Sequence, residues 1–310
     1  MSNRIWLASY PKSGNTWLRM LISCLSWPRD KAFDINAAAL RGGLASARAP
    51  FDDLLLIDSG LLTLDEVDCL RPRLYEELMR PGIFEDAEDD DRIAGQPVSF
   101  VKVHDAYTLT PLGEPLLAGA GGAQGAILIV RDPRDVASSL AHHSASTIDA
   151  AIDFMNDAAA GFNRSDMRQR KQFRQLLPGW SGHLASWLDQ RDIPVHLLRY
   201  EDMKRDTAGT LVGAMAFAGW TVTREAADRA VALAAFADLQ AQERATGFTE
   251  WVDSAASGRL FFRRGEAGAW TRELTQRQVA RIEAAHGPAM ARLGYTLSTD
   301  SRPSCQDRSS

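Results

Sequence analysis

The sequence predicts an α/β protein with a mostly parallel central sheet flanked by helices. Four short apolar runs have the length and composition of buried strands, and longer segments with helical spacing separate them. Because parallel strands need crossover connections, this alternation favours helices on both faces of one sheet. The four runs are residues 5–9, 98–103, 126–130 and 193–199.

The first run opens the stretch around which the chain is organised, IWLASYPKSGNTWLRMLISCL (5–25). A turn at residues 10–14 follows the strand and enters a segment with apolar residues at helical spacing. The first N–H groups of a helix have no intrahelical partner and attract anions, and the Lys, Ser, Gly and Thr of this turn add to that attraction. The loop lacks GxxxxGK[ST], so it is not a Walker A loop. The alternative is an ordinary strand–turn–helix in which Lys12 is only solvated.

Apolar periodicity weakens between the first two strands. Thr63 and Glu66 predict a capping box for a helix that ends or kinks near Pro72, and a second helical piece is expected over residues 75–79. The acidic run EDAEDDDR (85–92) lacks the spacing of metal ligands and is interpreted as a solvated loop.

Helices are also predicted throughout the second half of the chain. They begin at Pro133, cover about 148–162, 181–190 and 207–218, run from Thr223 to about Phe236, and open again at the capping box Thr275–Gln278. Gly287-Pro288 is expected to interrupt the last helix and Gly294 to end it. Residues 246–268 are expected to be a loop, and Trp180 and Trp187 are assigned to the core.

Length and composition predict one domain over residues 1–297, followed by a disordered tail at 298–310. The net charge of −5 argues against a general nucleic-acid binder. The three cysteines lack metal-ligand or disulfide-framework spacing, which favours a reducing compartment. Neither a signal peptide pattern nor a membrane-length apolar run occurs, so we expect a cytoplasmic protein without membrane or nucleic-acid partners.

Polar side chains follow all four predicted strands. Lys12 comes after the first, His104 after the second, Arg131 after the third and Tyr200 after the fourth. In parallel sheets ligands bind at the carboxyl ends of the strands, so these four residues are expected to share one site.

Four motifs in the same order resemble those of the cytosolic-type sulfotransferases that use 3′-phosphoadenosine 5′-phosphosulfate (PAPS). They are YPKSGNTW (10–17), RDPRDVASS (131–139), RYEDM (199–203) and FFRRGEAGAW (261–270). Matching pieces run from residue 5 to about 275, except for 30–95. The resemblance implies a P-loop-like PAPS-binding fold and sulfuryl transfer to a hydroxyl, or less readily an amine, with release of 3′-phosphoadenosine 5′-phosphate (PAP).

The resemblance also implies where PAPS binds. The 5′-phosphosulfate is assigned to Lys12, Ser13, Gly14, Asn15 and Thr16. The 3′-phosphate is assigned to Arg131, Ser139, Arg263, Arg264 and the backbone of Gly265, and the adenine contacts to Trp17, Tyr200 and Phe236. Guanidinium groups suit phosphate better than an ammonium group does.

Catalytic roles follow from the same resemblance. VKVHDAY (101–107) resembles the family's Lys-Thr-His segment, so His104 is expected to be the general base and Lys102 a helper near the sulfuryl oxygens. Lys12 is expected to stabilise charge on the bridging oxygen as PAP leaves, and Ser139 to restrain Lys12 before the acceptor arrives. No metal is expected. The other histidines are interpreted as structural: 142, 143, 183, 196 and 286.

The sequence departs from the family pattern at several positions. Asn15 replaces a usual Thr, and Arg264 replaces a usual Lys. Ala234 and Ala235 stand at positions where the family often has hydroxyl residues that contact the nucleotide. The family's C-terminal dimerisation pattern does not occur around 271–280, so no oligomeric state is predicted.

The acceptor is expected to be a small hydroxylated molecule bound by the segments that match nothing, about 30–95 and 246–258. Tyr107 and Phe154 are expected neighbours. The aromatic residues in those segments favour an apolar or aromatic acceptor: Phe33, Phe51, Phe84, Phe248 and Trp251. Two alternatives remain, a P-loop nucleotide kinase-like phosphotransferase, in which Asp132 would position a metal, and a catalytically inactive nucleotide-binding protein.

Overall fold

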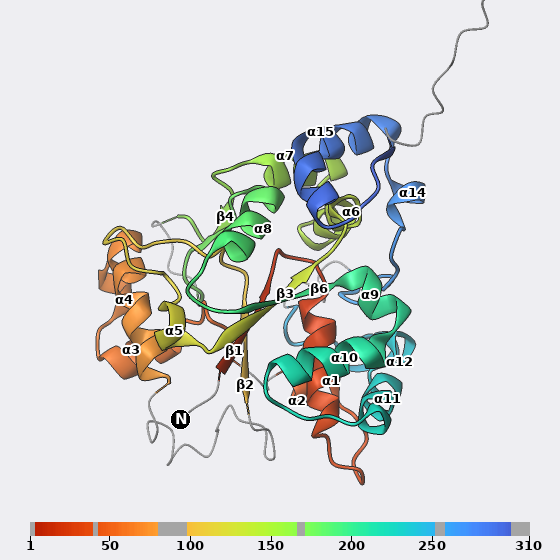
Figure 1. The fold of residues 1–310 in the computed structure, drawn as a ribbon, viewed down its shortest axis with the longest axis horizontal. Helices are drawn as coiled ribbons and strands as arrows, with labels where there is room; N and C mark the ends of the chain where they lie inside the picture. The colour runs from red at the N-terminus through yellow and green to blue at the C-terminus, as the bar shows by residue number, and fades with distance from the viewer. Residues whose placement is uncertain (1–3, 40–42, 80–97, 166–170, 252–257, 299–310) are drawn as a thin grey trace, which may run out of the picture.

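The centre of the molecule is a four-stranded parallel sheet in the order β2-β1-β3-β6 (Figure 1). The computed structural model describes residues 4–39, 43–79, 98–165, 171–251 and 258–298. The strands are β1 (Arg4–Ser9), β2 (Ser99–Val103), β3 (Gly125–Val130) and β6 (Val195–Arg199). All four coincide with the predicted apolar runs, which confirms the predicted fold class.

Helices cover both faces of this sheet (Figure 1). One group comprises α1 (Asn15–Leu25), α2 (Ile35–Ala39), α9 (Tyr200–Arg205), α10 (Thr207–Phe217), α11 (Arg224–Leu233) and α12 (Phe236–Thr246). The other comprises α3 (Ala49–Leu55), η1 (Ser59–Leu61), α4 (Leu64–Glu77), α6 (Pro133–His143), α7 (Ile148–Asn156), α8 (Gly179–Asp189) and α15 (Gln276–Arg292). Short elements complete the fold: α5 (Gly119–Gly122), α14 (Trp270–Glu273) and the antiparallel pair β4 (Gly161–Phe162) and β5 (Gln175–Leu176).

The core is divided by the sheet into two apolar clusters. Successive side chains of a strand point to opposite faces. In β1, Ile5 and Leu7 therefore pack with α1, α10 and α11, whereas Trp6 and Ala8 pack with α4, α6, α7 and α8. Both sets are buried, as expected for a parallel sheet covered on both faces.

The predicted helix starts agree with the structure at several positions. Thr63 and Glu66 form the capping box of α4, and Thr275 and Gln278 form that of α15. Pro133 occupies the first turn of α6, where its missing N–H leaves no hydrogen bond unmade.

The predicted interruption at Gly287-Pro288 is wrong, because Pro288 lies inside α15, and α4 continues through Pro72 and does not end there. Pro72 is itself buried, and no separate helical piece begins at residue 75. In α15 the preceding residue is Gly287, which has no Cβ to clash with the proline ring. Burial of Ile282 and Met290 compensates for the lost hydrogen bond.

Three predicted boundaries also need correction. The helix expected to reach residue 162 ends at Asn156, and residues 161–162 form β4 instead. Tyr200 begins a helix of its own before α10. Phe236 does not end α11 but begins α12. The acidic run at 85–92 and the tail from residue 299 lie outside the described residues.

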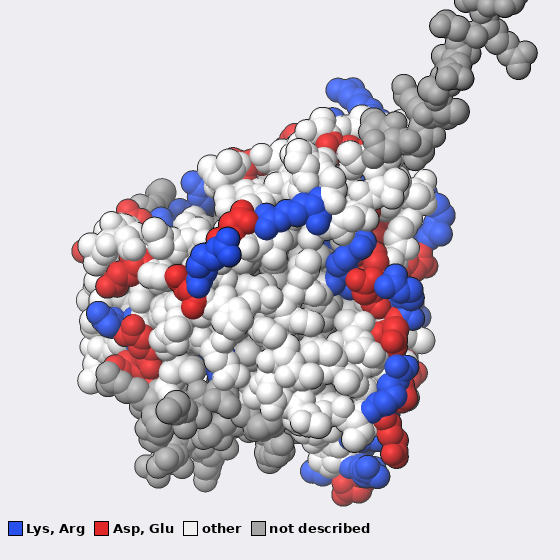
Figure 2. Space-filling model, viewed as in Figure 1, with Lys and Arg blue, Asp and Glu red and all other residues white. Residues whose placement is uncertain are grey.

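Charges of both signs lie side by side along the margin of the face in Figure 2, and the centre of that face carries few of them. Within the described ranges, no helix combines the length and the apolar composition that crossing a membrane requires.

Candidate active site

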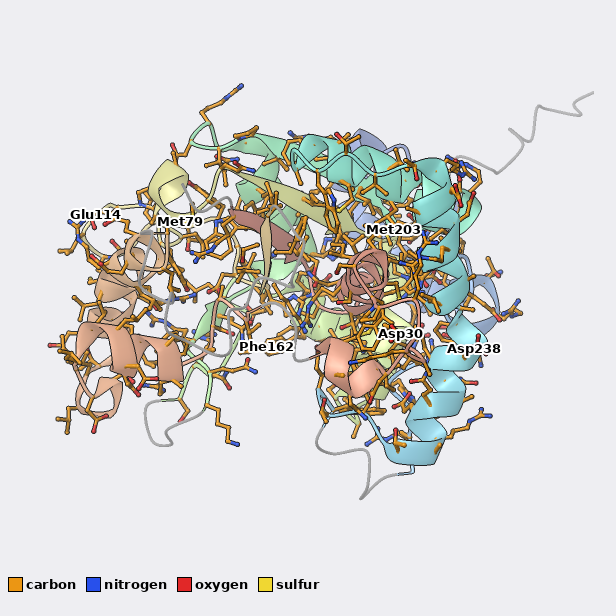
Figure 3. All side chains as sticks on the ribbon, turned by 90° about the horizontal axis from the view of Figure 1, so that it is seen from below. Asp30, Met79, Glu114, Phe162, Met203 and Asp238 are labelled. Carbon is orange, nitrogen blue, oxygen red and sulfur yellow. The ribbon has the colours of Figure 1, made fainter. Side chains whose placement is uncertain are left out.

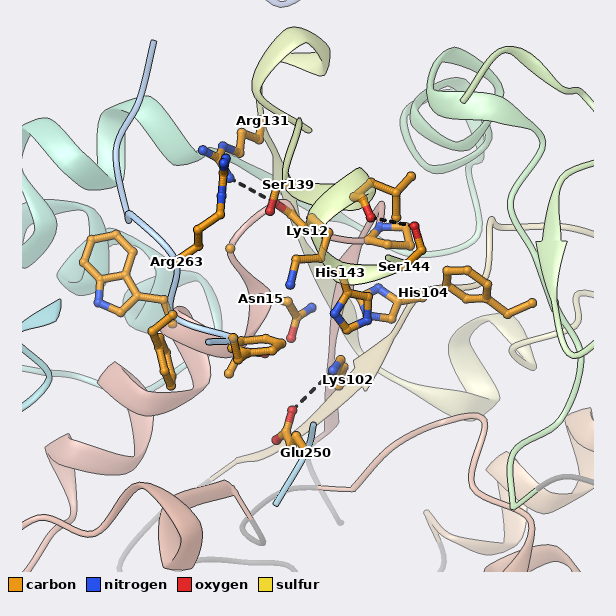
Figure 4. Close-up of a pocket in the computed structure, with 18 of the residues that line it drawn as sticks. Lys12, Asn15, Lys102, His104, Arg131, Ser139, His143, Ser144, Glu250 and Arg263 are labelled. Atoms are coloured by element: carbon orange, nitrogen blue, oxygen red, sulfur yellow. Dashed lines mark hydrogen bonds and ion pairs between the residues drawn. The ribbon is translucent and has the colours of Figure 1, made fainter. Parts of the chain in front are cut away.

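One cavity of about 690 Å³ lies at the carboxyl ends of the strands. The residues that follow the four strands all line it: Lys12, His104 and Arg131, which Figure 4 labels, and Tyr200. Phe162, which also lines the cavity, is labelled in Figure 3. In that view Met79 and Glu114 lie to one side of it, and Asp30 and Asp238 lie to the other side. The structure therefore brings together the residues that the strand-end argument selects.

The loop between β1 and α1 presents backbone and side-chain donors to this cavity. Lys12 and Gly14 have positive φ values of 68° and 107°, which turn the chain sharply before Asn15 opens α1. The Asn15 amide donates to the Leu7 carbonyl at 2.7 Å, while its Oδ1 has no partner among the described residues. Lys12, Gly14, Asn15, Thr16 and Trp17 line the cavity; Ser13 is buried behind them, and its Oγ also has no partner within the described part of the chain.

The Lys12 side chain is half-buried, and its ammonium lies 4.0 Å from the centre of the Phe261 ring. Desolvation and, to a smaller extent, the nearby charges of Lys102 and Arg131 together lower the pKa of Lys12 to about 7. Lys12 is therefore partly neutral near pH 7 when no anion is bound.

The orientation of His104 follows from one backbone contact. Its Nδ1 lies 2.8 Å from the Ser9 carbonyl oxygen, which can only accept, so Nδ1 carries the hydrogen and Nε2 carries the lone pair. Burial and the charge of Lys102 hold the pKa of His104 well below its usual value. The His183 ring lies 3.1 Å from the His104 carbonyl and supports the segment from behind. His104 is thus a neutral imidazole that can accept a proton at Nε2.

Lys102 has an acidic partner that the sequence analysis missed. Its Nζ lies 3.5 Å from Glu250, whose other carboxylate oxygen pairs with Arg19 (Figure 4). Burial lowers the pKa of Lys102, and Glu250 opposes that effect. Glu250 belongs to none of the motifs, because the stretch TGFTEW has no recognisable spacing.

His143 was interpreted as structural but lines the cavity as well. Its ring lies 5.9 Å from that of Trp251. Burial and the charge of Lys12 lower its pKa to about 3, so His143 is also neutral.

The arginines assigned to the 3′-phosphate occupy one side of the cavity. Arg131 donates to the backbone carbonyls of Lys12 and Glu266 at 3.3 and 2.8 Å and stacks 4.5 Å over the Tyr200 ring. Arg263 makes two hydrogen bonds of 2.9 Å to Glu273. Arg264 pairs with the same carboxylate at 2.7 Å, and Ser139 lines the cavity from α6.

Three aromatic rings of the motifs also belong to the lining of this cavity. Trp17, Tyr200 and Phe236 all line the cavity. A Cβ at Gly14 would lie 2.6 Å from the Tyr200 ring, and one at Gly265 would lie 2.4 Å from the Phe236 ring. Glycine at these two positions therefore lets the loops close onto the rings.

The residues expected around the acceptor are placed differently. Phe33, Phe51, Phe248 and Trp251 are buried in the core and do not line the cavity, and Phe84 lies outside the described residues. The Tyr107 hydroxyl donates to Asp192 at 2.7 Å, away from the lining, whereas Phe154 stacks on Phe162, which does line it. Of the two segments expected to bind the acceptor, Leu44 and Glu250 do line the cavity, together with the apolar residues Leu140, Phe162, Phe261 and Phe262. A polar part of the lining comes from around β4 and β5, two strands too short to give a sequence pattern: Asn163, Arg164, Ser165, Lys171, Gln172 and Gln175.

Comparison with solved structures shows the fold. The chain resembles retinol dehydratase in complex with androsterone and PAP, with a TM-score of 0.55, 18% sequence identity and coverage of 97% of this chain and 82% of that one. It also resembles mouse sulfotransferase SULT7A1 complexed with PAP, with a TM-score of 0.55, 18% identity and coverage of 93% and 85%.

Sequence relatives are sulfotransferases. Flavonol 3-sulfotransferase of Flaveria bidentis is 26% identical over 304 residues, which cover 95% of this chain and 84% of that protein. Luciferin sulfotransferase of Photinus pyralis is 29% identical over 203 residues, or 65% of this chain and 47% of that protein. Sulfotransferase 2A1 of Rattus norvegicus is 26% identical over 167 residues, or 53% and 56%. The chain thus matches about half the length of luciferin sulfotransferase and of sulfotransferase 2A1.

A model of the sulfotransferase domain matches residues 125–294, which is more than half of the 310 residues and contains three of the four motifs. The resemblance inferred from the motifs is confirmed: the chain belongs to the sulfotransferase domain family.

Proposed function

We propose that this protein transfers the sulfuryl group of PAPS to a hydroxyl group of a small molecule and releases PAP. The observation that carries the proposal is that one cavity is lined by the cations Lys12, Lys102, Arg131, Arg263 and Arg264 and by the aromatic rings of Trp17, Tyr200 and Phe236. A nucleotide with a 5′-phosphosulfate and a 3′-phosphate on its ribose needs cationic groups for both anions and apolar or aromatic contacts for its base. The names of the relatives support small acceptors, since they mention luciferin and flavonol.

Unpaired buried atoms support the fit of PAPS. Ser13 Oγ and Arg131 Nε, both of which can donate to an anion, have no hydrogen-bond partner among the described residues. Buried polar atoms without partners are costly, and a ligand bound nearby can reduce that cost. A cavity of about 690 Å³ is within the range that accommodates a ligand of this size.

Each group in the proposed mechanism has one task. PAPS supplies the sulfuryl group, and sulfuryl transfer, like phosphoryl transfer, depends on positioning and on charge stabilisation. His104 accepts the proton of the acceptor hydroxyl at Nε2, while the Ser9 carbonyl holds Nδ1–H and fixes the ring. Lys12 and Lys102 offset negative charge where transfer takes place, and Arg131, Ser139 and Arg263 hold the far phosphate.

Calorimetry with PAP and AMP tests the nucleotide assignment, because AMP lacks only the 3′-phosphate. We expect PAP to bind at least tenfold more tightly than AMP, since a site built for an anion leaves donors unpaired without it. Ser139→Ala and Arg263→Gln should reduce this ratio, whereas Arg292→Gln, at an exposed position on α15, should not. Equal affinity of the unmodified protein for PAP and AMP would overturn the assignment.

A transfer assay then tests the reaction. Labelled PAPS should give a labelled acceptor in the presence of EDTA, because we assign no step to a metal. Transfer that stops without magnesium would favour the kinase-like alternative.

A further inference from the structure

The acceptor end of the cavity is built on a short extension of the central sheet. Leu44 pairs with Lys102 of β2, and Ala47 pairs with Gln172. The amide of Phe173 donates to the Ser46 carbonyl at 2.7 Å. Residues 43–48 therefore connect β2 to the segment that leads into β5.

The same segment is attached to the proposed base. The amide of Ala106, two residues after His104, donates to the Leu176 carbonyl in β5 at 2.9 Å. Arg71 of α4 strengthens this junction, since it donates to both oxygens of Asp105 at 3.1 and 3.0 Å and to the Arg174 carbonyl at 3.0 Å. The side chains around β5 consequently have a fixed position relative to His104.

One of these side chains has an unused acceptor atom. Gln175 is only 2% exposed and lines the cavity. Its Nε2 donates to Gln172 Oε1 at 3.1 Å, which fixes the amide, while its Oε1 has no partner within the described ranges. A buried carbonyl oxygen of this kind is satisfied by a ligand that donates a hydrogen bond.

Two cations complete the same end of the cavity. Arg164 and Lys171 line it with exposed side chains. Arg164 donates to the Ala159 carbonyl, and neither cation is paired with a carboxylate that the structure describes. The carboxylates in the lining are Glu250, which pairs with Lys102 and Arg19, and Glu266, which pairs with Arg272. The positive charge of this end is therefore not balanced from within the lining.

We propose that the acceptor is a polar hydroxylated molecule with an anionic group, which Arg164 and Lys171 bind while Gln175 accepts a hydrogen bond. This inference rests on the proposed sulfuryl transfer and narrows its substrate class. It replaces the apolar acceptor favoured by the sequence, because the aromatic residues behind that expectation are buried in the core or lie outside the described residues. Phe162, stacked on Phe154 at a ring distance of 5.7 Å, still offers one apolar surface to the body of the molecule.

Acceptor pairs that differ in charge provide the test. Two pairs test a carboxylate: 4-hydroxyphenylacetate is compared with 4-hydroxyphenylacetamide, and glucuronate with glucuronamide. A third pair, glucose 6-phosphate and glucose, tests a phosphate. For each pair, binding to the PAP-saturated protein is measured by calorimetry, and kcat/KM is measured with PAPS. We expect the anionic member of at least one pair to be favoured about 10- to 100-fold, as charge-assisted hydrogen bonds allow.

Variants assign the preference to named side chains. The double variant Arg164→Gln/Lys171→Gln should bring the ratio of kcat/KM for the anionic acceptor to kcat/KM for the neutral acceptor close to one, and it should leave PAP affinity unchanged. In the unmodified protein, added salt should lower the same ratio. The control is Arg292→Gln, which removes an exposed cation paired with Asp189 on α8 and should keep the ratio.

Each result supports or overturns the inference. If no pair shows an anionic preference in binding or in turnover, or if the double variant keeps that preference, the inference is wrong. PAP binding separates this failure from that of the proposed function: a protein that binds PAP tightly but prefers neutral acceptors refutes only the acceptor class. A protein that does not bind PAP refutes both.

Discussion

At the scale of single residues, burial sets the protonation of the groups closest to the proposed transfer. Lys12 has a pKa of about 7, and the pKa of His104 lies well below its usual value, so both are biased toward their neutral forms before a ligand binds. A neutral imidazole is the form that can accept a proton, whereas a neutral amine cannot stabilise an anion. Before a ligand binds, the site therefore suits His104 for its proposed role, and Lys12 becomes charged when the nucleotide binds.

Replacement of His104 by Asn tests the base. Asn can still donate to the Ser9 carbonyl but cannot accept the acceptor proton, so His104→Asn should lower kcat about 10²- to 10⁴-fold on an alcohol acceptor and leave PAP affinity within about threefold. His143→Asn is the matched control, because His143 is also a neutral histidine in the cavity lining, and it should keep most of the turnover. The opposite pattern would assign the base to His143.

Lys12 predicts a pH dependence for PAP binding. The phosphates raise the pKa of Lys12 from about 7, so above that pH the protein takes up a proton when PAP binds. Affinity should be highest below about pH 7 and should fall as the pH rises above it. Calorimetry between pH 7.5 and 9, in buffers with different ionisation enthalpies, measures this proton uptake directly.

The variant Lys12→Met serves as the control for that measurement. It should bind PAP with less proton uptake and a flatter pH profile, and the remaining slope is expected from Lys102, whose pKa is also lowered by burial. An identical pH profile in both proteins would show that Lys12 is already fully charged in the free protein.

At the scale of secondary-structure elements, the sequence predicted what depends on local pattern. Each strand was recognisable as a short apolar run, and capping residues such as Thr63 and Thr275 marked their helices. The helix through Pro288 was not predictable, because packing of α15 against α6, α7 and α8 decides it. The two-residue strands β4 and β5 show no periodicity, so the polar lining that they carry could not be inferred either.

The candidate site was predictable to the extent that motifs extend over it. Of the residues assigned to PAPS or to catalysis, only Ser13 is absent from the cavity lining. Glu250 and Gln175 lie in stretches that match no motif, and only the three-dimensional path of the chain brings them to the cavity. Motifs therefore predicted the residues of the proposed nucleotide end, and the structure was needed to propose residues for the acceptor end.

Gly265 shows how a loop and a helix depend on each other in the nucleotide end. An Ala at this position would place its Cβ 2.4 Å from the Phe236 ring at the start of α12. Gly268 also has a positive φ, 78°, compared with 63° at Gly265, but no atom lies within 4 Å of the place that a Cβ at Gly268 would occupy. Both substitutions strain the backbone, and only Gly265→Ala adds a clash.

We therefore expect Gly265→Ala to weaken PAP binding at least tenfold and Gly268→Ala to change it less than threefold. Calorimetric titration of both variants measures the difference, and thermal unfolding shows how much stability each has lost. Equal losses of affinity would mean that backbone strain, and not the position of Phe236, determines binding.

At the scale of the whole molecule, the central sheet makes the two halves of the core interdependent. Every strand of the central sheet contributes side chains to the two clusters on its opposite faces, and β1, β2 and β3 contribute buried residues to both, so neither cluster persists when the sheet separates. The cavity also draws on distant parts of the chain, from Lys12 after β1 to Arg263 before α14. These observations support the prediction that residues 1–297 form one domain.

Differential scanning calorimetry of the full chain tests this prediction. We expect one transition in which the calorimetric and van't Hoff enthalpies agree, although chains of this length often unfold through intermediates. PAP at about 100 times its Kd should stabilise the folded state by about 2.7 kcal/mol, because it binds only that state. For a chain of this size that corresponds to a rise in Tm of about 5 °C or somewhat less, and the whole transition should move together. Two transitions, of which PAP shifts only one, would show that the nucleotide end and the remainder of the chain fold as separate units.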